Sequence, residues 1–182
     1  MQMDECIKSR RSVRKYTDRE ITKEELHEIV SLARFSPSWK NTQVIRYHAV
    51  KNPQLKETLA QNCMMGFEYN QKTVLRCNTL VVVSAVGGIC GYESDGSWST
   101  AKQDRWEMFD AGIASQTFCL AAHSKGIGSV ILGIFDEEKI HNFLHLPQEE
   151  KVMNLIALGY PLEEGKTAPA RKRTEQILEI IE

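Results

Sequence analysis

The feature that most constrains the fold is a long segment, residues 104–125, that is predicted to be helical and is apolar on most of its sides. Between Asp110 and Lys125 it contains no Asp, Glu, Lys or Arg. A helix that borders water carries polar residues along the exposed face. We therefore expect this helix to lie inside a domain or at an interface between two chains.

A second segment, residues 79–86, is a continuous run of apolar and β-branched residues, which is typical of a strand covered on both faces. Thr22 and Glu25 form a capping-box pattern that opens an amphipathic helix. The remaining elements are predicted as helices over 4–9, 53–65 and 136–146, strands over 44–50, 129–134 and 152–159, and a helix or strand over 174–181. Intermixed helices and strands predict an α+β fold with a central sheet covered by helices.

The chain length and net charge limit the classes to which the protein can belong. The 182 residues form no repeat or linker, so we expect a single domain over 1–182. A net charge of −1 gives no overall attraction for nucleic acid or an anionic membrane, and no apolar run approaches the length of a membrane helix. The polar N-terminus does not resemble a signal peptide, and five scattered cysteines without a Cys-x-x-Cys pair indicate a reduced, cytoplasmic protein.

A basic segment follows the first predicted helix. Arg10, Arg11, Arg14 and Lys15 place four cations within six residues, with Ser12 among them. Guanidinium groups beside a hydroxyl suit the phosphate of a mononucleotide, although a solvated basic turn would have the same composition. A second cluster, residues 171–173, either converges on the same anion or forms a separate exposed patch.

Residues 36–43 form a second informative segment, dense in short hydrogen-bonding side chains. Asn41 and Gln43 each offer two donors and an acceptor, which suits the pyrimidine edge or the ribityl hydroxyls of a flavin. Trp39, in the same segment, is a further candidate for the site. The alternative is an ordinary loop whose polar groups cap the backbone.

Five ordered segments together carry a family resemblance. They are Arg10-Arg11-Ser12-Val13-Arg14-Lys15-Tyr16, Ser36-Pro37-Ser38-Trp39-Lys40-Asn41-Thr42-Gln43, Asp110-Ala111-Gly112 through Gly126-Ile127-Gly128, Leu155 with Gly159-Tyr160-Pro161, and Arg171-Lys172-Arg173. Their order and spacing resemble those of the FMN-dependent nitroreductase family, and they span nearly the whole chain.

The resemblance implies a central mixed sheet covered by helices, with the long buried helix at the interface of a homodimer that binds two FMN molecules. The basic segment would hold the phosphate, residues 171–173 would close that site, and residues 131–133 would face the reactive nitrogen of the ring. Ser38 and Asn41 would reach the flavin from the partner chain. The candidate cofactor-binding residues are Arg10, Arg11, Ser12, Arg14, Pro37, Ser38, Trp39, Asn41, Gln43, Ile131, Leu132, Gly133, Arg171 and Arg173.

The activity implied is transfer of electrons from NAD(P)H through FMN to a small organic acceptor by a ping-pong mechanism, with no catalytic acid, base or nucleophile in the protein. Val44-Ile45 departs from the Pro-Trp of the family pattern, and the chain lacks a long insertion that larger members use as a lid. Two alternatives therefore stay open: a flavin-binding module without NAD(P)H turnover, and a reductive dehalogenase or flavin-cleaving relative of the same fold.

Two other patterns predict no site. Gly126-Ile127-Gly128 follows a helix and precedes a strand, which is the reverse of a dinucleotide-binding turn. His141 and His145 lie four residues apart but have no carboxylate or cysteine at ligand spacing, so we expect no metal there.

Overall fold

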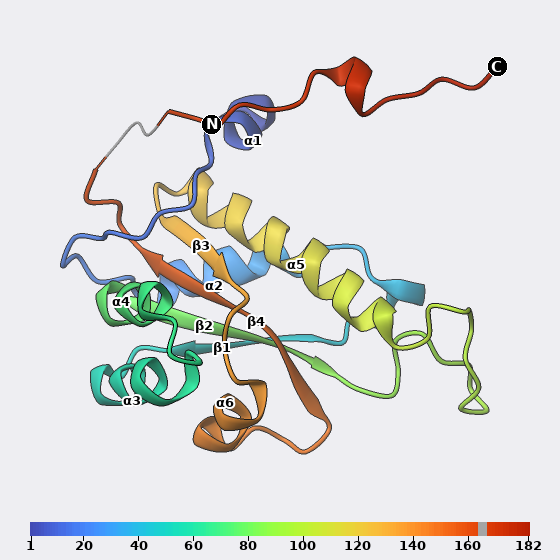
Figure 1. Ribbon diagram of the computed structural model, residues 1–182, viewed down its shortest axis with the longest axis horizontal. Coiled ribbons are helices and arrows are strands. Elements are labelled where there is room, and N and C mark those ends of the chain that lie inside the picture. The colour runs from blue at the N-terminus through green and yellow to red at the C-terminus, as the bar shows by residue number, and fades with distance from the viewer. Residues whose placement is uncertain (164–166) are drawn as a thin grey trace.

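A computed structural model describes residues 1–163 and 167–182 (Figure 1). The helices are α1 (Met3–Ser9), α2 (Lys23–Ala33), α3 (Pro53–Cys63), α4 (Glu68–Arg76), α5 (Arg105–Ser124) and α6 (Glu137–Leu144), with short 3-10 turns at Trp39–Asn41 and Thr174–Gln176. The strands are β1 (Ile45–Val50), β2 (Thr79–Val86), β3 (Gly128–Leu132) and β4 (Glu150–Gly159). This is the α+β arrangement that the sequence predicts.

The four strands form one sheet in the order β1-β2-β4-β3. Every pairing between these strands is antiparallel. The mixed sheet that we expected is therefore limited to one isolated parallel bridge, in which Ser12 lies beside Ser129 at the β3 edge. The central strand β2 is buried along nearly its whole length, as its continuous apolar sequence predicts.

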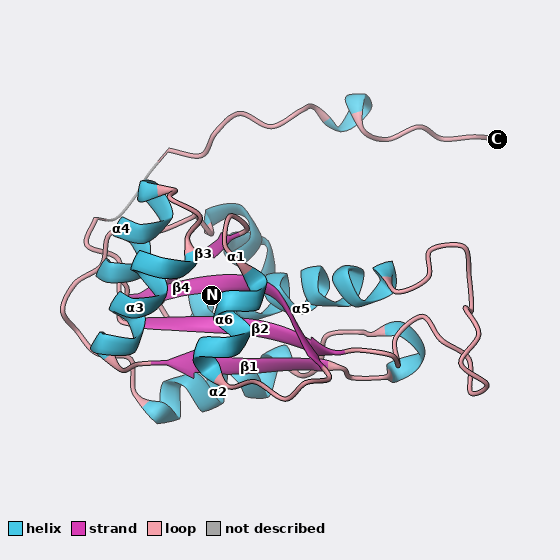
Figure 2. Cartoon of the chain, turned by 60° about the horizontal axis from the view of Figure 1, so that its bottom comes forward, coloured by secondary structure: helices cyan, strands magenta, loops and turns pink. Residues whose placement is uncertain are grey.

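Helices cover both faces of the sheet, as the two views show (Figure 1 and Figure 2). On one face α3, α4 and α6 pack through Leu59, Val74 and Ile140 against Leu80 and neighbouring strand residues. On the other face α2 and α5 pack in the same way, with Ile29 and Phe118 fully buried. The alternation of side chains along β2 supplies both cores, because successive residues point to opposite faces.

Two segments differ from the sequence prediction. Helix α4 was not predicted, and the preceding helix ends at Cys63 rather than at residue 65. The last predicted element is absent, since residues 174–181 hold only the Thr174–Gln176 turn and are otherwise irregular. This tail runs away from the sheet, and all of its described residues are exposed (Figure 1). A chain without packing partners gains too little from burial to order a regular element.

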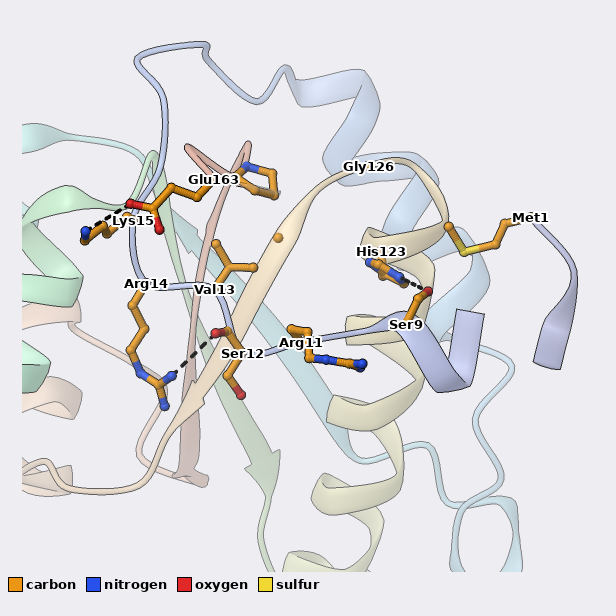
Figure 3. Close-up of a pocket in the computed structure, with 12 residues that line it drawn as sticks. Met1, Ser9, Arg11, Ser12, Val13, Arg14, Lys15, His123, Gly126 and Glu163 are labelled. Carbon is orange, nitrogen blue, oxygen red and sulfur yellow. Dashed lines mark hydrogen bonds and ion pairs between the residues drawn. The ribbon is translucent and has the colours of Figure 1, made fainter. Parts of the chain in front are cut away.

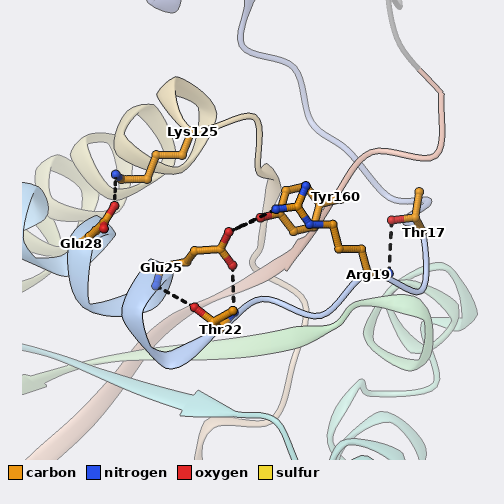
Figure 4. Close-up of polar contacts among 7 residues, drawn as sticks. All are labelled: Thr17, Arg19, Thr22, Glu25, Glu28, Lys125 and Tyr160. Atoms are coloured by element: carbon orange, nitrogen blue, oxygen red, sulfur yellow. Dashed lines mark hydrogen bonds and ion pairs between the residues drawn. The ribbon is translucent and has the colours of Figure 1, made fainter.

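The predicted capping box at the start of α2 is present and extends to the end of β4 (Figure 4). The Glu25 amide donates to Thr22 Oγ1 at 3.1 Å, and the Thr22 amide donates to Glu25 Oε2 at 2.8 Å. The Tyr160 hydroxyl donates to the same carboxylate, and Arg19 lies over the Tyr160 ring. Hydrogen bonds from Tyr160 and from the Thr22 amide hold the pKa of Glu25 below its usual range.

We predict that Glu25→Ala lowers the free energy of unfolding at pH 7 by about 1–2 kcal/mol, because it removes both the capping box and the Tyr160 contact. Because the pKa of Glu25 is lower in the folded state, the stabilisation by its carboxylate is complete above the unfolded-state pKa of about 4.3. This stabilisation is lost as the pH falls through the folded-state pKa. Urea unfolding at pH 7 and pH 3 should show the difference from wild type shrinking at pH 3.

Glu28→Ala is the matched control, because Glu28 is an exposed carboxylate of the same helix that pairs with Lys125. Glu28→Ala should lower the free energy of unfolding by less than about 1 kcal/mol. A Glu25→Ala cost that equals the Glu28→Ala cost at pH 7 would contradict the prediction.

Candidate functional site

The basic segment of residues 10–15 is held along the outer edge of β3. The Val13 amide donates to the Ser129 carbonyl at 3.0 Å, and the Tyr16 hydroxyl donates to the Val13 carbonyl at 2.5 Å. Gly128 permits this approach, because a Cβ at that position would lie 2.8 Å from Val13. Burial raises the pKa of Tyr16, so this anchoring hydroxyl keeps its proton.

Helix α1 attaches the start of the basic segment to the C-terminal end of α5. Ser9 Oγ lies 2.7 Å from His123 Nε2, and the Cys6 thiol donates to the Leu120 carbonyl at 3.5 Å. A cavity of about 280 Å³ lies here, lined among others by Arg11, Ser12, Arg14, Lys15, His123, Gly126 and Glu163 (Figure 3). Of the cations predicted for the phosphate, Arg11 and Arg14 line this cavity together with Lys15, and Arg10 is not among its lining residues.

The predicted ring-facing residues lie at the far end of β3. Ile131 and Gly133 are exposed, whereas Leu132 is buried in the core. The Arg14 guanidinium lies near this same end of the strand, because it is 5.4 Å from the centre of the Tyr69 ring and the neighbouring Asn70 donates to the Ile134 carbonyl. The structure thus brings Ser12, Arg14 and residues 131–133 along one sheet edge.

Helix α4 contributes two residues that the sequence did not indicate. The Arg14 guanidinium lies 5.4 Å from the centre of the Tyr69 ring, and Asn70 Nδ2 donates to the Ile134 carbonyl at 3.0 Å. Asn70 is buried and Tyr69 is exposed. The Glu68–Lys72 pair, four residues apart, was the available sign of a helix in this region.

The second predicted segment, residues 36–43, is anchored at the opposite end of α5. The Trp39 amide donates to both carboxylate oxygens of Asp110, at 3.1 and 2.9 Å. The Gln43 amide donates to Ser38 Oγ at 3.1 Å, and Lys40 Nζ lies 2.7 Å from the Glu93 carboxylate. Pro37, Ser38 and Gln43 line a cavity of about 370 Å³ between α2, β1 and α5.

The backbone of this segment is strained. Lys40, Asn41 and Gln43 all have positive φ, at 45°, 55° and 51°. A non-glycine residue in this region costs of the order of 1–3 kcal/mol, so such a loop persists only where its surroundings fix it. Strain of this kind is commonly found at ligand sites.

Each of the two segments carries a buried side-chain N–H without a hydrogen-bond partner. These are Arg14 Nε in the basic segment and Trp39 Nε1 in the second one. Buried polar groups in proteins are nearly always paired, so an unpaired donor calls for an explanation. A bound acceptor, such as a phosphate oxygen or a ring carbonyl, would satisfy such a donor.

One chain does not bring the two segments together. The first is attached to α5 at His123 and the second at Asp110, 13 residues earlier, which corresponds to about 20 Å along the helix. The two cavities share no lining residue. Each chain therefore presents two separate parts of the predicted site.

The C-terminal cations are not close to the basic segment in the described chain. The contacts of Arg171 and Arg173 stay within the tail, where Arg171 Nη1 donates to the Pro169 carbonyl and the Arg173 amide donates to Gln176 Oε1. Both arginines are exposed.

Comparison with known proteins identifies the family. The family model described as "Nitroreductase family" matches residues 7–160. The chain belongs to the nitroreductase family. The match begins within α1 and continues through β4, so it includes both segments attached to α5.

Relatives agree with this assignment over most of their length. A protein of Archaeoglobus fulgidus named "Putative NADH dehydrogenase/NAD(P)H nitroreductase" is 30% identical over 169 residues, which cover 89% of this chain and 88% of the relative. A nitroreductase family protein of Clostridium novyi NT is 28% identical with a TM-score of 0.76, covering 88% and 86% of the two chains. An FMN-dependent nitroreductase of Clostridium difficile R20291 is 26% identical with a TM-score of 0.78, covering 98% of each chain.

The described part of the chain has neither a membrane-spanning helix nor a metal-binding cluster. No described helix combines the length and apolar character that a membrane span requires. Within residues 1–163 and 167–182, no three His, Cys, Asp or Glu side chains form a group that could hold a metal ion. His141 instead hydrogen-bonds the Pro147 carbonyl, and His145 ends α6 in the left-handed conformation.

We predict that Gly128→Ala destabilises the protein by about 1–3 kcal/mol, because the new methyl group would overlap Val13 in the basic segment. Chemical denaturation of the single variants and of the Gly128→Ala/Val13→Ala double variant measures the effect. The double variant should be less destabilised than the sum of the two single variants, since Val13→Ala removes the Cγ1 and Cγ2 groups that would lie 2.9 and 2.8 Å from the new methyl. Simple additivity would show that the two residues are not in contact.

Proposed function

We propose that the protein is an FMN-dependent oxidoreductase that passes electrons from NAD(P)H to a small organic acceptor, such as a nitro compound or quinone, by a ping-pong mechanism. The single observation that carries this proposal is the basic segment on the β3 edge, with its buried unpartnered Arg14 Nε, in a member of the nitroreductase family. The names of the Archaeoglobus relative and of the Clostridium difficile structure support the nucleotide and the cofactor respectively.

The residues present fit FMN in charge and in shape. Arg10, Arg11 and Arg14 would bind the phosphate with the Ser12 hydroxyl, since guanidinium forks suit phosphate oxygens. The backbone of residues 131–133 would lie beside the ring, at the end of β3 near which the Arg14 guanidinium lies. Leu132 would contribute through its backbone, because its side chain is buried in the core.

The second segment would belong to the flavin site of another copy of the chain. Its attachment to α5 lies about 20 Å from that of the basic segment, so Ser38 and Asn41 serve a flavin more easily across a dimer than within one chain. Pro37, Trp39 and Gln43 would line the same side of that site. Arg171 and Arg173 would join a phosphate site only once the exposed tail packs on a surface.

Exposed apolar side chains support a homodimer. They occur on α1, on α2 and just after it, on α5 and in the tail, and include Met3, Ile7, Leu32, Phe35, Met108, Phe109, Ile177, Leu178, Ile180 and Ile181. Large exposed apolar patches mark interaction surfaces, so these side chains are the candidates for the interface. We further propose a cytoplasmic location, which is supported by five buried cysteines without disulfide partners.

FMN, when bound, supplies the redox chemistry, by taking a hydride from the nucleotide and later giving up its electrons. The cations of the basic segment would bind the phosphate, and the β3 edge would hold the ring. A ping-pong order would follow from nucleotide and acceptor using the same site in turn. No protein acid or base is needed at the transfer step.

We predict that the purified protein is yellow and contains roughly one FMN per chain. Its flavin absorbance near 450 nm should bleach on anaerobic mixing with NADH or NADPH. Prompt bleaching followed by reoxidation with a quinone or nitro compound supports the oxidoreductase. A flavin that stays oxidised with both nucleotides supports the flavin-binding module. Reoxidation by halogenated phenols with halide release, or loss of the flavin itself in oxygen, supports the dehalogenase or flavin-cleaving alternative.

We predict that Arg14→Ala and Asn41→Ala each weaken FMN binding, the first by about ten- to hundredfold through loss of a charged hydrogen bond. In a mixed dimer of one Arg14→Ala chain and one Asn41→Ala chain, a site shared between chains leaves one intact site and one doubly altered site. Such a dimer should bind half of its FMN with wild-type affinity. The two chains are co-expressed with different tags, purified by both tags and titrated with FMN.

The two homodimers serve as controls, and neither should show any tight site. If the mixed dimer also lacks a tight site, each flavin is bound within one chain. If Arg14→Ala binds FMN as tightly as wild type, the phosphate site is misassigned.

A further inference from the structure

Asp110 is a buried acid in the first half of α5. Its side chain is 2% exposed, and both of its oxygens accept the Trp39 amide hydrogen, at 3.1 and 2.9 Å. The Cys90 thiol also donates to Oδ2 at 3.2 Å. Burial, reinforced by the neighbouring Asp110 carboxylate, raises the pKa of Cys90 to about 12, so the thiol keeps the proton that it donates.

This carboxylate has no cation beside it in the described part of the chain, where none of the ion pairs involves Asp110. Burying a charge without a cation is unfavourable unless hydrogen bonds satisfy it. Asp110 therefore does not stabilise the fold by forming an ion pair. Its hydrogen bonds go to the segment of residues 36–43 and to the loop after β2.

The loop of residues 38–43 depends on such an attachment. Its three residues with positive φ disfavour the observed conformation, and two of its side-chain contacts are exposed: Ser38 to Gln43 within the loop, and Lys40 to Glu93 on the surface. Exposed ion pairs hold a conformation weakly. The hydrogen bond from the Trp39 amide ends on a buried side chain, Asp110, and the Trp39 ring packs on Trp106 beside it.

We infer that Asp110 is a positioning residue, which holds the 38–43 loop in its flavin-binding conformation before the cofactor arrives. The inference rests on the proposed function, because it assigns this loop to FMN. A loop that is only partly in the competent conformation binds its ligand more weakly, in proportion to the fraction that is competent. Loss of the Asp110 contact should therefore raise the apparent Kd for FMN without removing any residue that touches it.

Glu107 provides a matched control one turn earlier on the same helix. It is also 2% exposed, and it accepts hydrogen bonds from the Gly88 amide at 3.1 Å and from Lys151 at 2.8 Å. Neither of these contacts reaches residues 36–43. Glu107→Gln and Asp110→Asn each replace one oxygen of a buried α5 carboxylate by an NH2 group, which cannot accept a hydrogen bond. Only Asp110→Asn does so at an acceptor of the Trp39 amide hydrogen.

The experiment compares the apo forms of wild type, Asp110→Asn and Glu107→Gln in titrations with FMN, followed by quenching of flavin fluorescence. Thermal unfolding reports stability. Near-ultraviolet circular dichroism reports the loop directly, because the Trp39 and Trp106 rings are 4.2 Å apart and their coupling changes if Trp39 moves. We expect Asp110→Asn to raise the FMN Kd about tenfold and to change the tryptophan signal, with Glu107→Gln staying within about twofold of wild type.

Saturating FMN should return the tryptophan signal of Asp110→Asn to that of the wild-type complex, since the cofactor then selects the competent loop. An Asp110→Asn Kd within about twofold of wild type overturns the inference and leaves the proposed function intact. An equal rise for Glu107→Gln also overturns it, because the effect would then reflect general stability. A wild-type protein that binds no FMN overturns both.

If Asp110→Asn fails to fold, the wild-type apo-protein still tests whether Asp110 holds the loop. Hydrogen exchange of the Trp39 amide, measured by NMR, should be slow while the carboxylate accepts its hydrogen. Exchange at the rate of an exposed amide would show that the loop is not held in the apo form, and would overturn the inference.

Discussion

The packing of α5 against the sheet is the interaction on which the rest of the structure depends. Phe118 is fully buried and stacks on Tyr47 of β1, while small residues such as Ala111 and Ala122 allow the helix to lie close to the strands. The opposite side presents Met108 and Phe109, which are 53% and 54% exposed. One helix thus builds half of the core and, at its two ends, fixes both segments of the candidate site.

The elements that could be predicted from sequence are those determined by local pattern. Burial on both faces required residues 79–86 to be apolar throughout, and the capping box of Thr22 and Glu25 marked the start of α2. The basic segment and the polar 36–43 segment were recognised in the same way, because their side chains are concentrated over a few residues. Their role at a flavin came from the family resemblance rather than from composition.

Features that depend on distant contacts could not be predicted. Helix α4 has a polar sequence, and its packing on α3 determines that it forms. Asp110 was named only as part of the family pattern of the long helix, and only the folded chain shows that it accepts the Trp39 amide hydrogen. The irregular tail could not be predicted either, since its apolar residues fit a helix or a strand and find no surface in the described chain.

The separation of the two segments along α5 would make FMN binding depend on the concentration of the protein. If each cofactor site combines the basic segment of one chain with the 38–43 loop of another, binding of FMN and association of chains are thermodynamically linked, and each strengthens the other by the same factor. Dilution would then release cofactor even where free FMN is held constant. The cell could regulate the amount of active enzyme through flavin supply and through synthesis of the chain, with a steeper response than either would give alone.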